Sequence, residues 1–221
     1  MYREKNTFQQ VTKIRNEELG MINTPQDELK KILEAINARD EKNFSEHVDL
    51  KALMDIGYDE ATDVLADNCA KFHKLYPHDL FFKFGSRILR LYNDKFRGVH
   101  LGLIKKVIAS YFDGSFKDAQ SFSKTPIKFL AAELNTLLKA VRADFGEENI
   151  LGDKAFLNVK MVGDASSYGR MIDTLNFVLE FDKRGDEWRL YKIKNVEELV
   201  PPILDIAETY WPASWDLGIK L

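Results

Sequence analysis

The hydrophobic periodicity changes once along the chain, and this change constrains the fold more than any other feature of the sequence. Up to about residue 143, apolar residues recur every three or four positions, as they do in helices that bury one face. From Lys154 onward the period is two: Leu157, Val159 and Met161 alternate with polar residues, which indicates strands. A run of helices followed by consecutive strands predicts a segregated α+β fold with an antiparallel sheet meander and a final helix.

The first helix is expected to begin at Thr24-Pro25. Threonine is a favoured N-cap residue and proline suits the first helical position, while Asp27 and Glu28 favour the positive end of the helix dipole. Further helical segments are expected at residues 44–57, 59–75, 99–112 and 126–142, with an aromatic-rich stretch at residues 80–92. The sequence therefore predicts a helical layer over residues 24–143, preceded by a polar segment over residues 1–23.

Three strands are expected at residues 157–161, 175–181 and 188–193, joined by a loop at 163–169 and a hairpin turn at 183–186. Pro201 and Pro202 are expected to end the sheet region, and a last helix at 203–210 follows them. Residues 24–221 are thus expected to form one α+β domain, with the sheet and the last helix at 154–215.

Two short stretches resemble parts of known protein families. Residues 35–40, which read Ala-Ile-Asn-Ala-Arg-Asp, are followed by Phe44 and by Val48-Asp49-Leu50, and this opening resembles that of several bacterial families of unknown function. The closing pattern, made of residues 175–181, Gly185, residues 188–193 and Asn195, resembles the last two strands of cystatin-like and nuclear-transport-factor-like folds. The resemblance implies a helix packed on a curved antiparallel sheet, often in the extracytoplasmic part of an anchored protein.

Cysteine content and hydropathy exclude several classes of protein. Cys69 is the only cysteine, so an internal disulfide and a four-thiolate zinc site are both excluded. The longest run without a charged residue, 19–26, has eight residues, far fewer than the roughly 18 that a membrane helix requires. The first residues contain no apolar segment typical of a signal peptide. We therefore expect a soluble cytoplasmic protein, or an extracytoplasmic one if the natural chain has a longer N-terminus.

The charges are segregated along the chain although they nearly cancel overall. The formal net charge is −3, which argues against a generally basic nucleic-acid-binding protein. Residues 24–68 carry a net charge of −7, residues 71–117 carry +7 and residues 144–221 carry −6. The basic block is therefore the strongest candidate for a binding site.

Six basic residues make up the candidate anion-binding surface: Lys83, Arg87, Arg90, Arg97, Lys105 and Lys106. On a continuous helix, the first four of these side chains lie within about 80° of one another. Such a stripe suits the phosphates of a nucleic acid or of lipid headgroups. The alternative is internal pairing, because Asp59, Asp63 and Asp67 form a carboxylate row at spacing four on the preceding helix. We favour this alternative, because exposed ion pairs are ordinary surface features.

Cys69, His73 and His78 are the one cluster with the character of metal ligands, and Asp79 or His100 could complete a zinc site. Cys69 and His73 share a helical face at spacing four. However, Cys69 falls on the same side as apolar neighbours, and free cysteine is among the most buried residue types. We therefore expect a core cysteine, and neither a metal nor a cofactor.

Support for catalysis is slight. The chain has no Gly-x-Ser-x-Gly motif, and Gly98 and Gly102 do not continue into a phosphate-binding loop. Their spacing of four predicts a close helix crossing or a break between two helices. Acid–base chemistry in a pocket on the sheet would need a residue such as Asp173, Tyr168 or Tyr191, but any sheet contains such residues.

The aromatic tail at residues 210–215 is expected either to dock on the chain's own core or, less favoured, to act as an exposed interaction anchor. Taken together, the sequence predicts a non-enzymatic module that binds a protein or a small molecule. The alternatives are an anion-binding surface in the basic block and, with less support, a small-molecule enzyme with a pocket on the sheet.

Overall fold

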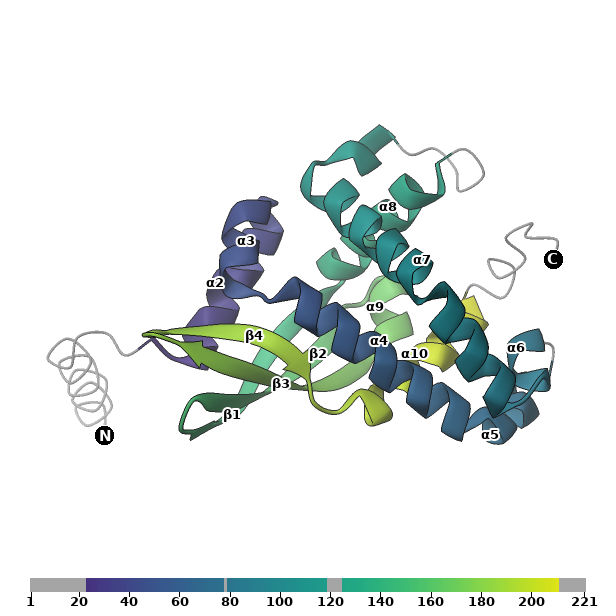
Figure 1. Ribbon diagram of the computed structural model, residues 1–221. Coiled ribbons are helices and arrows are strands. Elements are labelled where there is room, and N and C mark those ends of the chain that lie inside the picture. Colours follow the sequence, from purple (N-terminus) through teal and green to yellow (C-terminus); the bar gives the residue numbers. More distant parts are fainter. Residues whose placement is uncertain (1–22, 78, 119–124, 211–221) are drawn as a thin grey trace, which may run out of the picture.

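The computed structural model describes residues 23–77, 79–118 and 125–210, and it confirms the α+β class: helices come first, then a four-stranded antiparallel sheet, then a final helix (Figure 1). The helices before the sheet are α2 (Pro25–Ala38), α3 (Glu41–His47), α4 (Leu50–Asp67), α5 (Cys69–Leu75), α6 (Leu80–Lys83), α7 (Ser86–Phe112), the 3-10 turn η1 (Ser115–Asp118) and α8 (Pro126–Lys139). The remaining elements are β1 (Val141–Leu151), β2 (Lys154–Gly163), α9 (Ser167–Ile172), β3 (Thr174–Arg184), β4 (Glu187–Ile193) and α10 (Val196–Tyr210).

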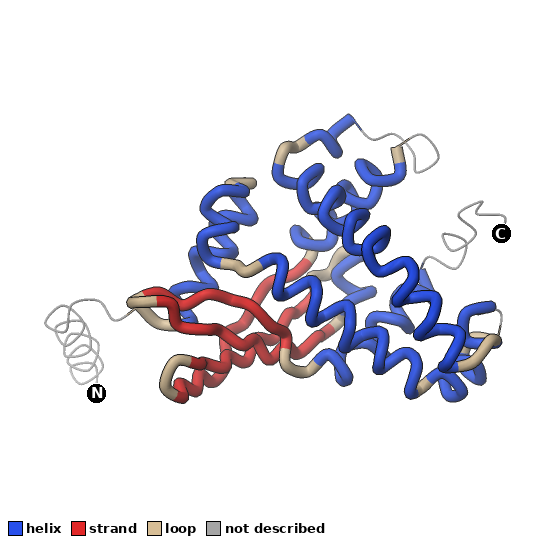
Figure 2. The backbone as a smooth tube through the Cα atoms, viewed as in Figure 1, coloured by secondary structure: helices blue, strands red, loops and turns tan. Residues whose placement is uncertain are grey.

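The four strands form a simple meander in the order β1-β2-β3-β4, and every neighbouring pair is antiparallel. Ala155 pairs with Phe181 and Leu157 with Leu179, so these four side chains share one face of the sheet. Ala155, Leu157 and Phe181 are completely buried on that face. Figure 2 shows most of the helices gathered on one side of the sheet. The opposite face carries mainly polar or half-exposed side chains.

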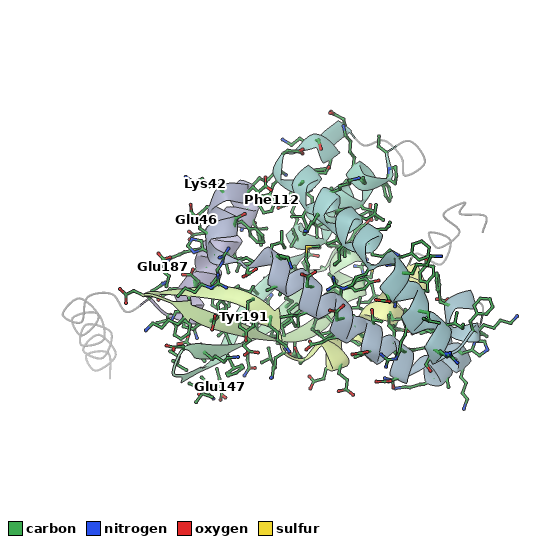
Figure 3. The ribbon with its side chains drawn as sticks, viewed as in Figure 1. Lys42, Glu46, Phe112, Glu147, Glu187 and Tyr191 are labelled. Carbon is green, nitrogen blue, oxygen red and sulfur yellow. The ribbon has the colours of Figure 1, made fainter. Side chains whose placement is uncertain are left out.

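The main core lies between this sheet face and the helices α2, α3, α7 and α8. Leu29, Ile32 and Ala35 of α2 are buried in it. Phe44 of α3 meets Phe112 at the end of α7, with ring centroids 5.0 Å apart (Figure 3). The C-terminal end of α7 is thereby fixed to the sheet domain.

A second, smaller core joins α4, α5, α6, α7 and α10. Its buried members are Ala66, Cys69, Phe72, Phe82 and Leu89, and Val200 and Leu204 of α10 pack against them. The N-terminal part of α7 is anchored through Leu89, whereas its C-terminal part belongs to the main core. The 27-residue helix α7 therefore bridges the two cores.

The predicted start of the first helix is confirmed in detail. The Thr24 hydroxyl accepts a hydrogen bond from the Asp27 backbone N–H at 3.1 Å, and Pro25 occupies the first helical position. The predicted strands and the hairpin turn before β4 are also confirmed, and Gly185 in that turn has φ +66°, which glycine adopts without strain.

The predicted boundaries at residues 44–57 and 59–75 are wrong. Phe44 belongs to α3, whereas α4 begins at Leu50 and runs through Gly57 as far as Asp67. The break that does occur is at Asn68, whose side-chain amide donates to the Val64 carbonyl at 3.0 Å. The same carbonyl also accepts from the Asn68 backbone N–H at 3.1 Å, so the Asn68 side chain adds a second bond at the end of α4, and α5 begins one residue later.

The continuous helix over residues 83–97, on which the predicted basic stripe depends, does not form. Gly85 has φ +82°, so α6 ends at Lys83 and α7 begins at Ser86. From Ser86 the helix then continues without a break to Phe112, across the boundary that the sequence placed near residue 98.

The strand β1 was not predicted, and the expected helix at 126–142 ends three residues early, at Lys139. The sheet therefore begins at Val141 rather than at Lys154. A register shift between Phe145 and Glu148 interrupts the alternation of apolar and polar residues in β1, which hides the period of two. The Glu148 carboxylate accepts from the Gln26 backbone N–H at 3.0 Å, so it satisfies a donor at the start of α2.

Two boundaries near the C-terminus also differ from the prediction. The expected loop at 163–169 contains the start of α9. The last helix begins at Val196 instead of residue 203 and includes both Pro201 and Pro202. Proline costs helix hydrogen bonds, but α10 continues through both because Val196 and Leu199 are buried and Leu204 packs on the second core. Within the residues that the structure describes, no helix has the length and apolar character needed to span a membrane.

Candidate functional site

The inner side of α7 faces α4, and two of the six candidate basic residues are paired there. Arg90 bonds to Asp63 and, at 2.6 Å, to Asp67. Arg97 contacts Asp59 at 2.8 Å and Asp55 at 3.2 Å. The predicted internal pairing of the basic helix with the acidic row is therefore confirmed for Arg90 and Arg97, which take no part in a free anion-binding surface.

Toward the middle of α7, the contact between α7 and α4 continues with a polar contact between Tyr58 and His100. Tyr58 of α4 lies 2.7 Å from His100 Nδ1 and donates to the Asn93 carbonyl at 3.1 Å. Burial lowers the pKa of His100, which favours the neutral ring. Rings of Tyr58, Tyr92 and Phe96 surround the imidazole. Together with the ion pairs, this cluster holds α7 in one orientation on α4.

The outer side of α7 carries large apolar side chains that face solvent. Their exposed fractions are 48% for Ile88, 57% for Leu91, 59% for Val99 and 44% for Leu103. At 100° per residue, these four positions lie within about 120° of the helix circumference. They form a continuous apolar arc on the side away from Arg90 and Arg97.

Four basic residues of α7 lie in and beside this apolar arc, Arg87, Lys95, Lys105 and Lys106, whereas Lys83 lies on α6, before the break at Gly85. All five are exposed, and none forms an ion pair with another residue of the described chain. Lys95 contacts the ring of Phe96, with its Nζ 5.5 Å from the ring centroid. We call the four cations of α7, together with Ile88, Leu91, Val99 and Leu103, the α7 outer surface.

Gly98 and Gly102 also lie on this side of the helix. The sequence predicted a close helix crossing or a break at this pair, and both expectations are wrong for the described part of the chain. The helix is continuous through both glycines, and a Cβ atom built on either would meet nothing within 4 Å. Along this stretch the helix backbone is open to solvent and accessible to a binding partner.

A hollow of about 420 Å³ lies at the C-terminal end of the α7 outer surface. It is lined by α7, the following turn and the start of α8, with Lys106, Ser110 and Asp113 among its residues. The Ser110 and Ser115 hydroxyls are 2.8 Å apart and satisfy each other. Asp113 accepts from the Ser115 backbone N–H at 2.7 Å, so the two serines and this carboxylate are engaged in local structure, whereas Lys106 is not.

The candidate metal ligands Cys69 and His73 do not form a metal site in the described part of the chain. Cys69 is 3% exposed, as expected of a core residue, and its thiol donates to the Phe82 carbonyl at 3.2 Å. Burial raises the pKa of this thiol, which disfavours the thiolate that binds metals. His73 lies one turn further along α5, and His78 lies outside the described residues. No group of three or more histidine, cysteine, aspartate or glutamate side chains that could hold a metal ion occurs in the described ranges.

The three residues suggested for a pocket on the sheet are not brought together. Tyr168 and Asp173 lie on α9 and at its end rather than on a strand, and Asp173 is exposed. The Tyr168 hydroxyl donates to Glu133 of α8 at 2.6 Å, which raises the pKa of Tyr168 to about 12. Tyr191 does lie on the sheet, on β4 (Figure 3).

Tyr191 takes part in a closed hydrogen-bonded cluster. Its hydroxyl donates to Glu180 at 2.5 Å, and Lys154 Nζ donates to both at 2.9 Å. Burial raises the pKa of Glu180, but these two donors outweigh it, so the pKa lies below its usual range. The carboxylate is therefore a partner of Lys154 in a structural pair and is poorly suited to accept a proton at neutral pH.

The exposed apolar residues of α7 were missed from the sequence, although a signal for them was present. Treating residues 80–92 and 99–112 as two segments separated Leu91 from Val99 and Leu103. A single helical projection across Gly98 places all three on one side. Lys95 belongs to the same side, and it was not among the six basic candidates.

A scan against protein-family models, a search of curated proteins and a search of solved structures each found no match. The resemblance to cystatin-like and nuclear-transport-factor-like folds therefore stays a prediction. The aromatic tail after Tyr210 lies outside the described residues.

Proposed function

We propose that this protein is a non-enzymatic interaction module that binds a protein partner through the α7 outer surface. The observation that carries the proposal is the row of exposed Ile88, Leu91, Val99 and Leu103 on one side of a single helix. Single exposed apolar residues are common, but a contiguous group of them marks a contact surface.

The shape of this surface supports binding rather than catalysis. Small-molecule and active sites are concave and place a few polar groups so that they converge on one point. The α7 outer surface is the convex side of a helix, and its cations spread along the helix instead of converging. Such a surface suits a second helix or another extended apolar face.

The surface is also preformed. Arg90 and Arg97 fix the inner side of α7 to α4, and Phe112 fixes its C-terminal end to α3. A partner would therefore bind a rigid helix, and association would cost little conformational entropy on this side of the interface.

Binding to anionic lipid headgroups is a second candidate, because the four cations of the α7 outer surface have no acidic partner in the described chain. Helices with a basic and an apolar side lie on anionic membranes. Nucleic acid is a weaker candidate, because phosphate contacts would leave Leu91 and Val99 in water.

A photo-crosslinking experiment tests the proposal. A photoreactive amino acid replaces Val99, and a control carries it at Asn158, an exposed residue of β2. We expect a specific adduct with another protein from Val99 alone. Leu91→Glu should abolish this adduct, whereas Leu151→Glu should not, because Leu151 is similarly exposed (61%) but lies on β1.

Three outcomes would contradict the proposal. The first is equal labelling from Val99 and Asn158, and the second is an adduct confined to the same chain. The third is cosedimentation with vesicles containing 30% phosphatidylserine that Leu91→Glu abolishes, in the absence of any protein adduct. That result would favour the lipid candidate.

A further inference from the structure

We infer that the partner binds the α7 outer surface with an amphipathic helix whose apolar face is bordered, and interrupted, by acidic side chains. This inference rests on the proposed function and adds the chemistry of the partner.

Charge is the first part of the argument. Between Lys83 and Lys106 the sequence contains one acidic residue, Asp94. The charges of Arg90 and Arg97 are matched by carboxylates of α4, but the four cations of the α7 outer surface are not matched by any described residue. A second copy of this chain that docked through the same surface would bring like charges together. An acidic partner satisfies them instead.

The position of two lysines argues for a protein rather than a lipid surface. At 100° per residue, Lys95 and Lys106 project from the middle of the apolar arc, within about 20° of each other. On a membrane, both ammonium groups would face the apolar interior and would have to bend back toward water. A protein helix can instead place a glutamate opposite each lysine, inside the apolar contact.

The spacing of the cations gives the length of the partner segment. Arg87 and Lys106 are 19 residues apart on one continuous helix, which corresponds to about 28 Å at 1.5 Å per residue. A partner helix of about 20 residues therefore reaches the cations at both ends of α7. Anchors at spacing three and four are the usual way in which such a helix contacts an apolar surface.

Two synthetic peptides of 20 residues test the inference with the full-length chain. Both have the same leucine and alanine face; one carries glutamate and the other lysine at the bordering positions and at two positions within the apolar face. Binding is measured by fluorescence anisotropy at 50 and 300 mM NaCl. We expect the glutamate peptide to bind at least tenfold more tightly than the lysine peptide, and to bind more weakly at the higher salt concentration.

Variants of the chain locate the peptide. Leu91→Glu and the double variant Lys95→Glu/Lys106→Glu should each weaken binding of the glutamate peptide at least tenfold. Leu151→Glu and Lys42→Glu are the matched controls, since both change exposed residues on other elements, and they should leave binding unchanged. Circular dichroism shows whether each variant keeps the fold.

The alternative results are separable. Equal binding of the two peptides, or binding of neither, would overturn the acidic partner, while cross-linking from Val99 still decides the proposed function by itself. Binding that Leu91→Glu does not weaken would place the peptide elsewhere and overturn the inference. A dimer in light scattering that Leu91→Glu dissociates would identify a second copy as the occupant and overturn it as well.

Discussion

Replacing Gly163 by alanine should destabilise the protein more than any other glycine-to-alanine change at a described position outside the left-handed region. A Cβ atom at Gly163 would lie 1.8 Å from the carbonyl oxygen of Gly169, and ordinary contact begins at 3.4 Å. The end of β2 and the start of α9 would therefore have to separate by about 1.6 Å. The obstructing atoms all belong to the Gly169 backbone, so no side-chain rotation can relieve the clash.

The size of the effect follows from what this separation disturbs. The Gly163 N–H donates to the Asp173 carbonyl and the Asp164 N–H to the Ala140 carbonyl, both at 2.8 Å. Overpacking of about 2 kcal/mol, together with about half of the roughly 1 kcal/mol that each of the two hydrogen bonds contributes, gives a loss of roughly 3 kcal/mol in the free energy of unfolding. For a chain of this size the midpoint of thermal unfolding should fall by roughly 6–12 °C.

The same substitution at Gly98 is the matched control, and its expected effect has the opposite sign. Gly98 is exposed within α7 and has open space around it, so alanine should stabilise the helix by about 0.5–1 kcal/mol. Urea unfolding followed by circular dichroism measures both variants. A Gly163→Ala protein as stable as the wild type would refute the close approach of β2 and α9, and a destabilised Gly98→Ala protein would refute an open α7 outer surface.

Three further predictions concern ionisable groups. Glu28 is fully buried and contacts His47 Nδ1 at 2.5 Å, so Glu28→Ala should cost about 3 kcal/mol in urea unfolding, whereas a cost below 1 kcal/mol would contradict a buried pair. Arg90→Ala removes two exposed ion pairs and should lower the midpoint of urea unfolding only slightly, and by less in 0.5 M NaCl; a loss that does not change with salt would contradict the ionic origin. The pKa of Tyr168, about 12 in the fold against 10.0 ordinarily, means that the folded state retains a proton which the unfolded chain loses, so stability should fall as the pH rises from 10 to 12. Tyr168→Phe should reduce this fall, and an identical pH profile would count against the bond to Glu133.

The fold class and several elements could be predicted because their signals are local. The Thr24 cap, the apolar face of α2 and the alternation in β2 and β3 all depend on residues close in sequence. By contrast, β1 was missed because its signals depend on residues distant in sequence. The register shift near Gly146 arises in the pairing with β2, and Glu148 bonds to the start of α2. Likewise, α10 keeps its two prolines because of contacts with α4 and the second core.

The candidate site was predicted in part. The sequence identified the basic block and the acidic row that matches it, and two of the arginines do pair as expected. It could not divide the block into paired and free cations, because that division depends on the break at Gly85 and on how α7 crosses α4. The exposure of Leu91 and Val99 depends on the same crossing, since a helical projection shows which side chains share a face but not which face is covered.

The indole of Trp188 donates to the carbonyl of Asn23, two positions from the start of α2, and 165 residues separate these partners. At roughly 5–20 residues per second, a ribosome makes Trp188 about 10–30 s after Asn23. During that interval Leu29 and Ile32 have no complete sheet to cover them, and the edge of β4 that pairs with Val48 does not yet exist. The nascent N-terminal helices are therefore exposed to chaperones and to aggregation until the last strand is made, and a slow codon anywhere between α2 and β4 lengthens this exposure.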